Sequence, residues 1–329
     1  MRLKLRYLNA LALALVAVLA AAVLVPLASA DPAWPTRPVK FILTLGPGSG
    51  SDIEARLFAD RLAQRWGQPV VVENRPGGDG IVAINAFVSA HDDHVLLLTP
   101  TSSFTAHPFL HENLPYKPSD LIPITRLSNT IVAISVPTSL NIKSIDQLVA
   151  LARAQPGTLN WAGVTGALDF LLAGWLQEEK LTMTKVAYKN PVDAANDLAE
   201  GRVQLYESAF AIARPQIETG KITPLAVTNT VRAPSRPDLP TVREAGYPDL
   251  TVDGLVGLFG PTGMSTELRQ RITADVRAVA DATIKDRLAT TGQILNVGGS
   301  EEFAKSIDEQ RAQVAEFAKK LGVQPLPQN

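Results

Sequence analysis

The stretch from Val39 to Arg65 limits the possible folds more than any other part of the sequence. It begins with the apolar run VKFILTL, continues as GPGSGSD and ends as IEARLFADRLAQR. An apolar run rich in β-branched and large residues, followed by a turn cluster, predicts a buried strand. The last part has apolar residues at helical spacing. We therefore predict a strand, a glycine-rich loop and an amphipathic helix in direct succession.

The loop between that strand and that helix has glycines at alternate positions: Gly46, Gly48 and Gly50. We expect Asp52 to be the N-cap of the helix. The buried face of the helix is expected to carry Ile53, Leu57 and Leu62. Such a loop presents backbone N–H groups at the positive end of a helix dipole, where anions bind. We interpret it as one side of a pocket for a small carboxylate; the alternative is a tight turn in which glycine only supplies a positive φ.

The first 30 residues have the pattern of a secretory signal peptide. Three basic residues precede an apolar run over residues 8–27, and Ala28-Ser29-Ala30 supplies a small-residue cleavage site. We expect export to the periplasm with cleavage after Ala30. The alternative is an uncleaved anchor, because the apolar run approaches the length that spans a bilayer. The chain has no cysteine, so an exported form must be held by its core without disulfides.

The order of the remaining segments predicts an α/β chain with two lobes. The 329 residues are enough for two domains of about 150 residues each. Strand-like and helix-like segments alternate, which favours a parallel sheet with ligand groups at the carboxyl ends of its strands. Two apolar segments, residues 122–137 and 222–228, are expected to cross between the lobes, the first as two strands that meet at residues 127–129. After a strand at 254–261, two helices at 266–280 and 301–321 are expected to finish the chain.

We place the first lobe at residues 31–126 and 228–329 and the second lobe at residues 127–227. The formal net charge of −1 gives no indication of a nucleic-acid partner or of a basic membrane-binding surface. An exported chain with two lobes and two crossings is typical of a hinged binding protein that closes over its ligand.

Six segments in order resemble one family. They are RPVKFILTLGPGSGSDIEAR, VVVENRPGGDG, LPYKPSDLIPI, AYKNPVDAANDLAEGRVQ, IETGKITPLAVT and RPDLPTVREAGYP. The chain resembles the Bug family, the periplasmic solute-binding subunits of tripartite tricarboxylate transporters, over residues 34–322. The resemblance implies a type II periplasmic-binding-protein fold, a small organic acid held in a cleft between the lobes, and delivery to integral membrane subunits. We expect a monomer that is not an enzyme and needs no cofactor.

The resemblance also implies where the ligand binds. Loops at helix N-termini would face each other across the cleft, with residues just past two strand ends lining the rest. These positions are Gly48, Ser49, Gly50, Ser51, Asp52, Thr101, Ser102, Ser103, Thr165, Gly166, Ala167 and Ser208. Asp52 is expected to be a cap rather than a ligand contact, because its carboxylate would repel an anion.

This sequence departs from the family pattern in the second lobe. Where the family usually has glycines, a hydroxyl and a histidine, the loop carries Thr165, Ala167, Leu168 and Leu171. An acid or amide of the family is replaced by Ser208, and a usual tryptophan by Leu255. Polar groups have been exchanged for apolar ones, so a partly apolar or aromatic acid is favoured over citrate.

Other functions have weaker support in the residues. Gly46-x-Gly48 with Glu73 imitates a dinucleotide fingerprint, but Ser51 stands at its third glycine. The four histidines, His91, His94, His107 and His111, have spacings that metal sites use, but their neighbours are typical of polar turns. We expect solvated surface histidines, no metal site and no catalytic residue. An exported sensor or regulator of the same fold remains the alternative to transport.

Overall fold

The computed structural model describes residues 34–163, 166–188 and 190–328, with Ser103 described for its backbone only. The predicted signal peptide lies outside these residues. The chain divides between Thr36 and Arg37, and the following description is of the compact unit that begins at Arg37. None of the described helices combines the length and the apolarity needed to cross a bilayer.

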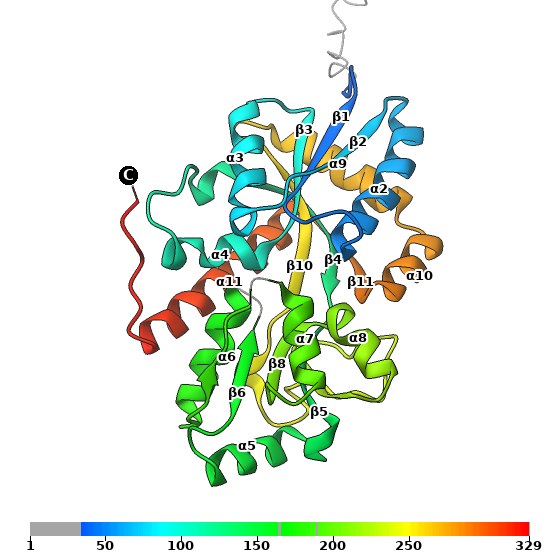
Figure 1. The fold of residues 1–329 in the computed structure, drawn as a ribbon. Helices are drawn as coiled ribbons and strands as arrows, with labels where there is room; N and C mark the ends of the chain where they lie inside the picture. The colour runs from blue at the N-terminus through cyan, green and yellow to red at the C-terminus, as the bar shows by residue number, and fades with distance from the viewer. Residues whose placement is uncertain (1–33, 164–165, 189, 329) are drawn as a thin grey trace, which may run out of the picture. The chain divides into compact units, whose positions relative to one another are not determined.

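The first sheet of this unit has six strands in the order β11-β4-β10-β3-β1-β2 (Figure 1). Its strands are β1 (Val39–Leu43), β2 (Val70–Asn74), β3 (Val95–Pro100), β4 (Ile122–Thr130), β10 (Gly254–Gly260) and β11 (Gln293–Gly298). The strand β1 pairs in parallel with β2 and β3, as predicted for successive strand–helix units. The other pairs are antiparallel, so a wholly parallel sheet is wrong. The reason is that the chain returns from the second sheet directly into β10, which lies between β3 and β4. No crossover helix precedes β10 to restore the parallel direction.

The helices that accompany this sheet follow its strands in the chain. They are α2 (Gly50–Trp66), α3 (Ile81–Ala90), α4 (Thr101–Leu110), α9 (Thr266–Val279), α10 (Ala282–Thr290) and α11 (Ser300–Lys320). The apolar part of the buried face of α2 consists of Ala55, Phe58, Ala59 and Leu62. Of the three residues predicted for this face, Leu62 is fully buried, whereas Ile53 and Leu57 are only half-buried. The helix α10 and the strand β11 were not predicted from the sequence.

The second sheet has five strands in the order β7-β6-β8-β5-β9. Its strands are β5 (Val132–Pro137), β6 (Asn160–Gly163), β7 (Thr184–Lys185), β8 (Leu205–Ala209) and β9 (Ile222–Val227). The helices of this part are α5 (Ile145–Ala154), α6 (Ala167–Glu178), α7 (Pro191–Ala199) and α8 (Phe210–Glu218). Its largest core cluster packs Trp161 and Trp175 against aliphatic side chains of α5 and α6. The two-lobed α/β architecture expected from the sequence is confirmed.

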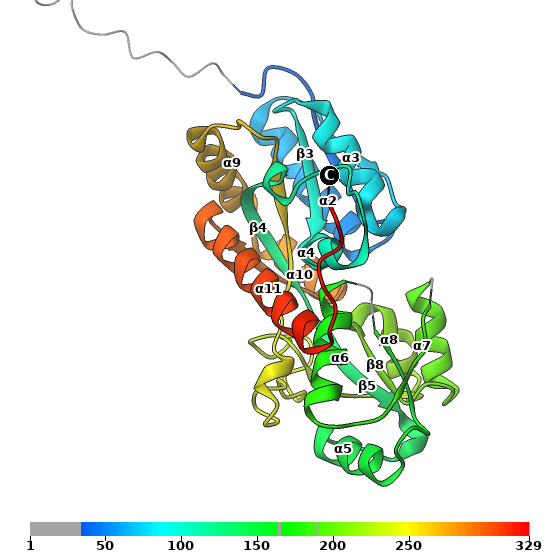
Figure 2. The same cartoon turned by 90° about the vertical axis from the view of Figure 1, so that its left-hand side faces the viewer.

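The chain passes between the sheets where β4 ends at Thr130 and β5 begins at Val132 (Figure 2). Two strands therefore form this crossing, as expected, although they meet at Ile131. Residues 222–228 were expected to be the return crossing, but they contain β9, which pairs with β5 in the second sheet. The chain reaches the first sheet again at β10, after Val242 and Leu250 have packed in the core of the second. The lobe boundaries stay a prediction.

Asn229 ties the crossing segments together. Its Oδ1 accepts a hydrogen bond from the backbone N–H of Val132 at 3.0 Å, and its Nδ2 donates to the carbonyl of Thr130 at 2.9 Å and to Asp253 Oδ1 at 3.2 Å. Val252 N–H also donates to the carbonyl of Thr228 at 2.9 Å. These bonds hold three chain segments side by side at the junction of the two sheets, which is where a hinge between lobes would bend.

Candidate functional site

Three helices begin at one edge of the first sheet. The helices α2, α3 and α4 follow β1, β2 and β3, whose carboxyl ends lie at the same edge because the three strands are parallel. Thr44 and Thr99 meet behind this edge, with 2.7 Å between their buried hydroxyl oxygens. Gly80, at the start of α3, lies against Thr44, where an added Cβ would come within 3.2 Å of Thr44 Cγ2. The edge thus gathers three helix N-termini, the feature that binds anions in parallel α/β sheets.

The N-cap of α2 is Ser49, so the expectation that Asp52 is the N-cap was wrong. The Ser49 hydroxyl accepts from the backbone N–H of Asp52 at 3.2 Å. Asp52 stands three residues further on, and its Oδ2 accepts from the backbone N–H of Gly48 at 2.9 Å. This N–H is therefore occupied, whereas those of Gly50 and Ser51 belong to the first turn, whose N–H groups have no acceptor within the helix.

Asp52 is the centre of a hydrogen-bond network rather than an open charge. Burial opposes its ionisation, but hydrogen bonds from Arg56, Gly48 and Asn74 outweigh that cost and lower its pKa. Arg56 Nη2 lies 3.0 Å from Asp52 Oδ1, and Asn74 Nδ2 donates to the same oxygen at 2.9 Å. Asn74 also donates to the carbonyl of Leu45 at 2.9 Å. The Asp52 carboxylate thus organises the glycine loop through its hydrogen bonds.

Thr101 and Ser102, expected just past a strand end, open α4. The Thr101 side chain is fully buried, and its hydroxyl donates to Gln310 Oε1 of α11 at 2.7 Å. Its side chain therefore faces α11, and only its backbone N–H is available at the helix start. Ser102 is half-buried. The side chain of Ser103 lies outside the described part of the structure.

The second-lobe part of the predicted site lies at the end of β6 and the start of α6. Thr165 lies outside the described residues; Gly166 has a φ of 100°, and Ala167 is fully buried as the first residue of α6. Ser208 lies inside β8 and is buried, so its placement past the strand end was wrong. Its hydroxyl makes one long hydrogen bond, 3.4 Å to the carbonyl of Ala209.

Glu207 is a residue of this region that the sequence analysis missed. It lies on β8 opposite Gly163 of β6 and is fully buried, and neither of its carboxyl oxygens has a hydrogen-bond partner in the described part of the chain. Burial, together with the nearby charge of Asp169, raises the pKa of Glu207 well above its usual value. Asp169 itself pairs with Lys185. A single acid within the apolar run LYESA was the available signal.

Parts of the two lobes that carry these residues are in contact. Ala106 of α4 packs in one cluster with Ala167 and Phe170 of α6, and the rings of Phe109 and Phe170 lie 5.7 Å apart. A second contact joins Gly292, just before β11, to Ala211 of α8: a Cβ added to Gly292 would lie 3.4 Å from the Cβ of Ala211. The helices that open the predicted site in each lobe therefore lie beside the same junction rather than on remote faces (Figure 1).

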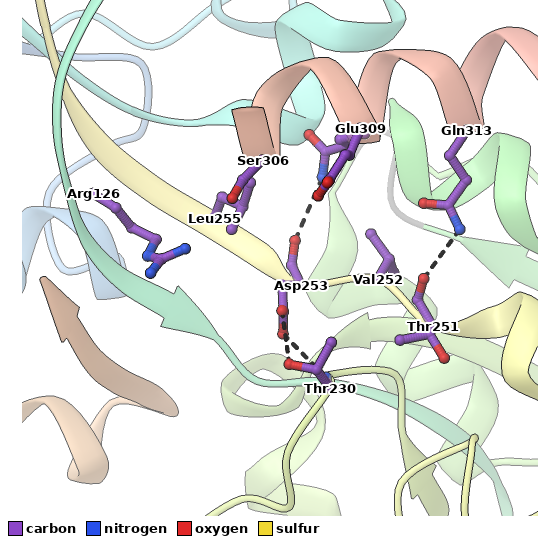
Figure 3. A pocket seen from close by; sticks show the side chains of 10 residues that line it. Arg126, Thr230, Thr251, Val252, Asp253, Leu255, Ser306, Glu309 and Gln313 are labelled. Carbon is purple, nitrogen blue, oxygen red and sulfur yellow. Dashed lines mark hydrogen bonds between the residues drawn. The ribbon is translucent and has the colours of Figure 1, made fainter. Parts of the chain in front are cut away.

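A pocket of about 330 Å³ lies on another side of this junction, between α11 and the crossing segments (Figure 3). None of the predicted site residues lines it. Its acids include Asp253, which binds Thr230, and Glu309. Its one basic side chain, Arg126, is already paired with Glu302 at 2.5 Å. This charge balance does not suit a carboxylate, so the pocket is not a second candidate for an organic acid.

Two of the four histidines contradict the expectation of a solvated surface. His94 is 5% exposed and its Nδ1 lies 2.6 Å from Asp93 Oδ1. His107 is fully buried, because it lies within the helix α4 and not in a polar turn. Burial, and the nearby His111, lower the pKa of His107 to about 4, so its imidazole is neutral at pH 7.

Comparison with known proteins places this chain among solute-binding proteins. Residues 54–323 match the family described as "Tripartite tricarboxylate transporter family receptor". Protein BugT of Bordetella pertussis is 30% identical over 245 residues, which cover 73% of this chain and 75% of BugT. A UPF0065 protein of Agrobacterium vitis is 30% identical over 287 residues, with 85% and 82% covered.

Two solved structures extend this similarity to the fold. R. palustris Rpa4515 with adipate is 28% identical with a TM-score of 0.77, covering 89% of this chain and all of that one. The periplasmic binding protein BugD is 26% identical with a TM-score of 0.72, covering 90% of this chain and all of that one. The two-lobed fold is therefore shared over nearly the whole chain.

Proposed function

Because this chain belongs to the tripartite tricarboxylate transporter receptor family, a family of periplasmic solute-binding proteins and not of enzymes, we propose that it captures a small carboxylate between its lobes and delivers it to a transporter of that type. The observation that carries this proposal is the convergence of the N-termini of α2, α3 and α4 at one sheet edge beside α6. Helix N-termini bind anions without needing a charged side chain.

Backbone groups supply most of the proposed binding. The first-lobe donors are the N–H groups of Gly50 and Ser51 in α2 and of Thr101 and Ser102 in α4. The second-lobe donors are the N–H groups of Gly166 and Ala167 at the start of α6, and we expect Thr165, outside the described residues, to add to them. A charge-assisted hydrogen bond contributes about 1.5–3 kcal/mol, so a few of them give micromolar affinity after ordering costs.

The apolar residues of the second lobe favour an acid with a hydrocarbon part. Ala167 and Leu168, both buried, stand where the family usually has polar residues. The relative Rpa4515 was solved with adipate, a dicarboxylic acid with an aliphatic chain, which supports the same ligand class. We propose a mono- or dicarboxylic acid with an apolar body.

Closure of the lobes would couple binding to delivery. The anion meets donors from both lobes only when they approach, so ligand shifts the hinge equilibrium toward the closed form. The lobes, residues 31–126 with 228–329 and residues 127–227, would move about the segments that Asn229 joins. A monomer suffices for this mechanism, and the membrane subunits would recognise the closed form.

A charge placed at Ser102 tests the ligand site without damaging the fold. Ser102→Asp puts a negative charge in the first turn of α4, where acidic residues stabilise a helix and where the anion would bind. We expect the mature protein, beginning at Asp31, to show a higher melting temperature with millimolar mono- and dicarboxylates. Ser102→Asp should abolish this shift, whereas the neutral control Ser102→Asn should keep most of it. A ligand that stabilises Ser102→Asp as well as the native chain would place the anion elsewhere.

Transport is tested separately from binding. A strain that lacks this protein should lose uptake of the acid that the melting screen identifies, and the Ser102→Asn variant should restore it. Binding with undiminished uptake in the deletion strain would favour the exported sensor instead.

A further inference from the structure

Asp79, His107 and His111 form a cluster apart from the proposed carboxylate contacts. One ligand atom from each lies within 4.8 Å of the other two. Asp79 Oδ2 is 3.9 Å from Nε2 of His107 and 3.9 Å from Nε2 of His111. The two imidazole rings are 5.1 Å apart and perpendicular. Three side chains from two segments therefore point at one small volume.

The backbone conformation brings these three side chains together. His107 lies in α4 and His111 is its C-cap, four residues later, so both are on one side of the helix. Asp79 lies in the turn after β2 with a φ of 58°, a left-handed conformation that few residues other than glycine adopt. Strained backbone of this kind concentrates at functional sites. The turn holds the Asp79 carboxylate against the helix.

The surroundings match those of a metal-binding histidine. Nδ1 of His107 contacts the hydroxyl of Tyr116, and Nε2 lies 3.1 Å from the backbone carbonyl oxygen of Asp79, a hydrogen bond that a bound ion would replace. A hydrogen bond on the second ring nitrogen is the usual support of a histidine ligand. Nε2 of His111 is shielded from solvent and has no hydrogen-bond partner among the described residues. A shielded nitrogen without a partner is costly unless something binds it.

We propose that Asp79, His107 and His111 bind a divalent transition metal ion, with Zn²⁺ as the best fit. Imidazole and carboxylate ligands together select zinc and its neighbours rather than Mg²⁺ or Ca²⁺. Metal–ligand bonds of about 2.0–2.2 Å bring tetrahedral ligand atoms to roughly 3.3 Å of one another. The distances of 3.9 Å therefore need to shorten only slightly, and the partly exposed His111 side chain has room to move. Three protein ligands leave one coordination position for water.

Such an ion would fasten three parts of the first lobe. It would join the turn at Asp79 to the carboxyl end of α4, the helix whose first turn supplies proposed carboxylate donors. The C-terminal segment is joined to the same place: Leu326 N–H donates to the carbonyl of Pro108 at 2.8 Å, and Gln328 Nε2 to that of His111 at 2.9 Å. The proposal does not depend on the identity of the organic acid.

A second cluster serves as the matched control. Asp92, Asp93 and His94 also lie within reach of one another. There Asp92 already accepts from Arg37 at 2.6 Å and from the backbone N–H of His94 at 2.9 Å, while Asp93 binds the His94 ring. Only one histidine is present there, and Asp92 is paired with the Arg37 guanidinium, so we expect no ion at this second cluster.

The test is metal binding to the untagged mature protein after chelator treatment. We expect one Zn²⁺ per chain by calorimetry, a higher melting temperature with Zn²⁺, and visible absorption bands when Co²⁺ replaces it. His111→Gln and Asp79→Asn should each weaken Zn²⁺ binding at least 10-fold while leaving the metal-free melting temperature nearly unchanged, because His111 is partly exposed and asparagine tolerates the left-handed backbone. His94→Gln should bind as the native chain does. The proposal is overturned if Zn²⁺ at 10-fold excess does not bind, or if His94→Gln removes binding that His111→Gln retains.

Discussion

Glu54 offers the sharpest test of the electrostatics of the first lobe. This side chain on the second turn of α2 is fully buried. Gln293 Nε2 donates to its Oε2 at 2.9 Å, while Oε1 has no partner in the described part of the chain. Burial raises the pKa of Glu54 to about 8, against the lowering effect of hydrogen bonds from Ser128 and Gln293. At pH 7 the folded protein therefore holds Glu54 as a neutral acid.

The raised pKa makes Glu54 a destabilising residue above mildly acidic pH. Below the unfolded pKa of 4.5, the carboxyl is protonated in both states and costs nothing. Between 4.5 and about 8 the unfolded state loses the proton and the folded state keeps it, so the free energy of unfolding falls by about 1.4 kcal/mol per pH unit. At pH 7 this amounts to on the order of 3 kcal/mol.

The variant Glu54→Gln keeps the shape of the side chain and removes this cost. We expect urea unfolding to show Glu54→Gln more stable than the native chain by about 2–3 kcal/mol at pH 7, with the difference close to zero at pH 4.5. The control Asp60→Asn alters an exposed acid on the same helix and should show no comparable trend. A difference between Glu54→Gln and the native chain that stays constant from pH 4.5 to 8 would mean that Glu54 is ionised in the folded protein.

Three further substitutions test the packing and the caps. In Gly174→Ala the new Cβ would lie 2.0 Å from Phe317 Cδ1, so we expect the free energy of unfolding in urea to fall by about 1–3 kcal/mol. The control Gly46→Ala places its Cβ where no atom lies within 4 Å and should lower the free energy of unfolding by less than about 1 kcal/mol. Asn229→Ala leaves the Val132 N–H and the Thr130 carbonyl without their side-chain partners and should lower the free energy of unfolding by about 3 kcal/mol. An unchanged midpoint of urea unfolding would mean that Asn229 does not stabilise the crossing between the sheets. Ser49→Ala removes the N-cap of α2 and should cost about 1 kcal/mol by the same assay, with weaker carboxylate binding by calorimetry; full affinity would exclude the α2 N-terminus from the site.

Local signals predicted what lies close together in the sequence. The strand β1, its glycine loop and α2 are consecutive, so periodicity and turn chemistry were sufficient to find them. The same signals could not choose between Ser49 and Asp52 as the cap, because both residue types cap helices well. The choice depends on Gly48, Asn74 and Arg56, which hold Asp52 in its network.

Contacts between distant residues were beyond such reasoning. The partner of Thr101 is Gln310, 209 residues away, and nothing near Thr101 indicates that its hydroxyl faces α11. An acid in an amphipathic helix is normally expected in solvent, but Glu54 is buried. Its hydrogen-bond partner Gln293 lies 239 residues away, so no local pattern could reveal the burial. The strand β11 was missed for the same reason, since its pairing with β4 depends on residues more than 150 positions away.

The acids around the proposed site can be reconciled with a negatively charged ligand. Asp52 stands beside the α2 N-terminus, but Arg56 neutralises it and the Gly48 N–H occupies its Oδ2. Burial keeps Glu54 neutral at pH 7, and burial with the nearby charge of Asp169 raises the pKa of Glu207 well above its usual value. Asp169 at the start of α6 is paired with Lys185. Asp52 and Asp169 are thus paired with a cation, Glu54 is protonated, and burial opposes ionisation of Glu207. Backbone groups at the helix N-termini can therefore attract an anion, because pairing or burial reduces the negative charge of these four acids.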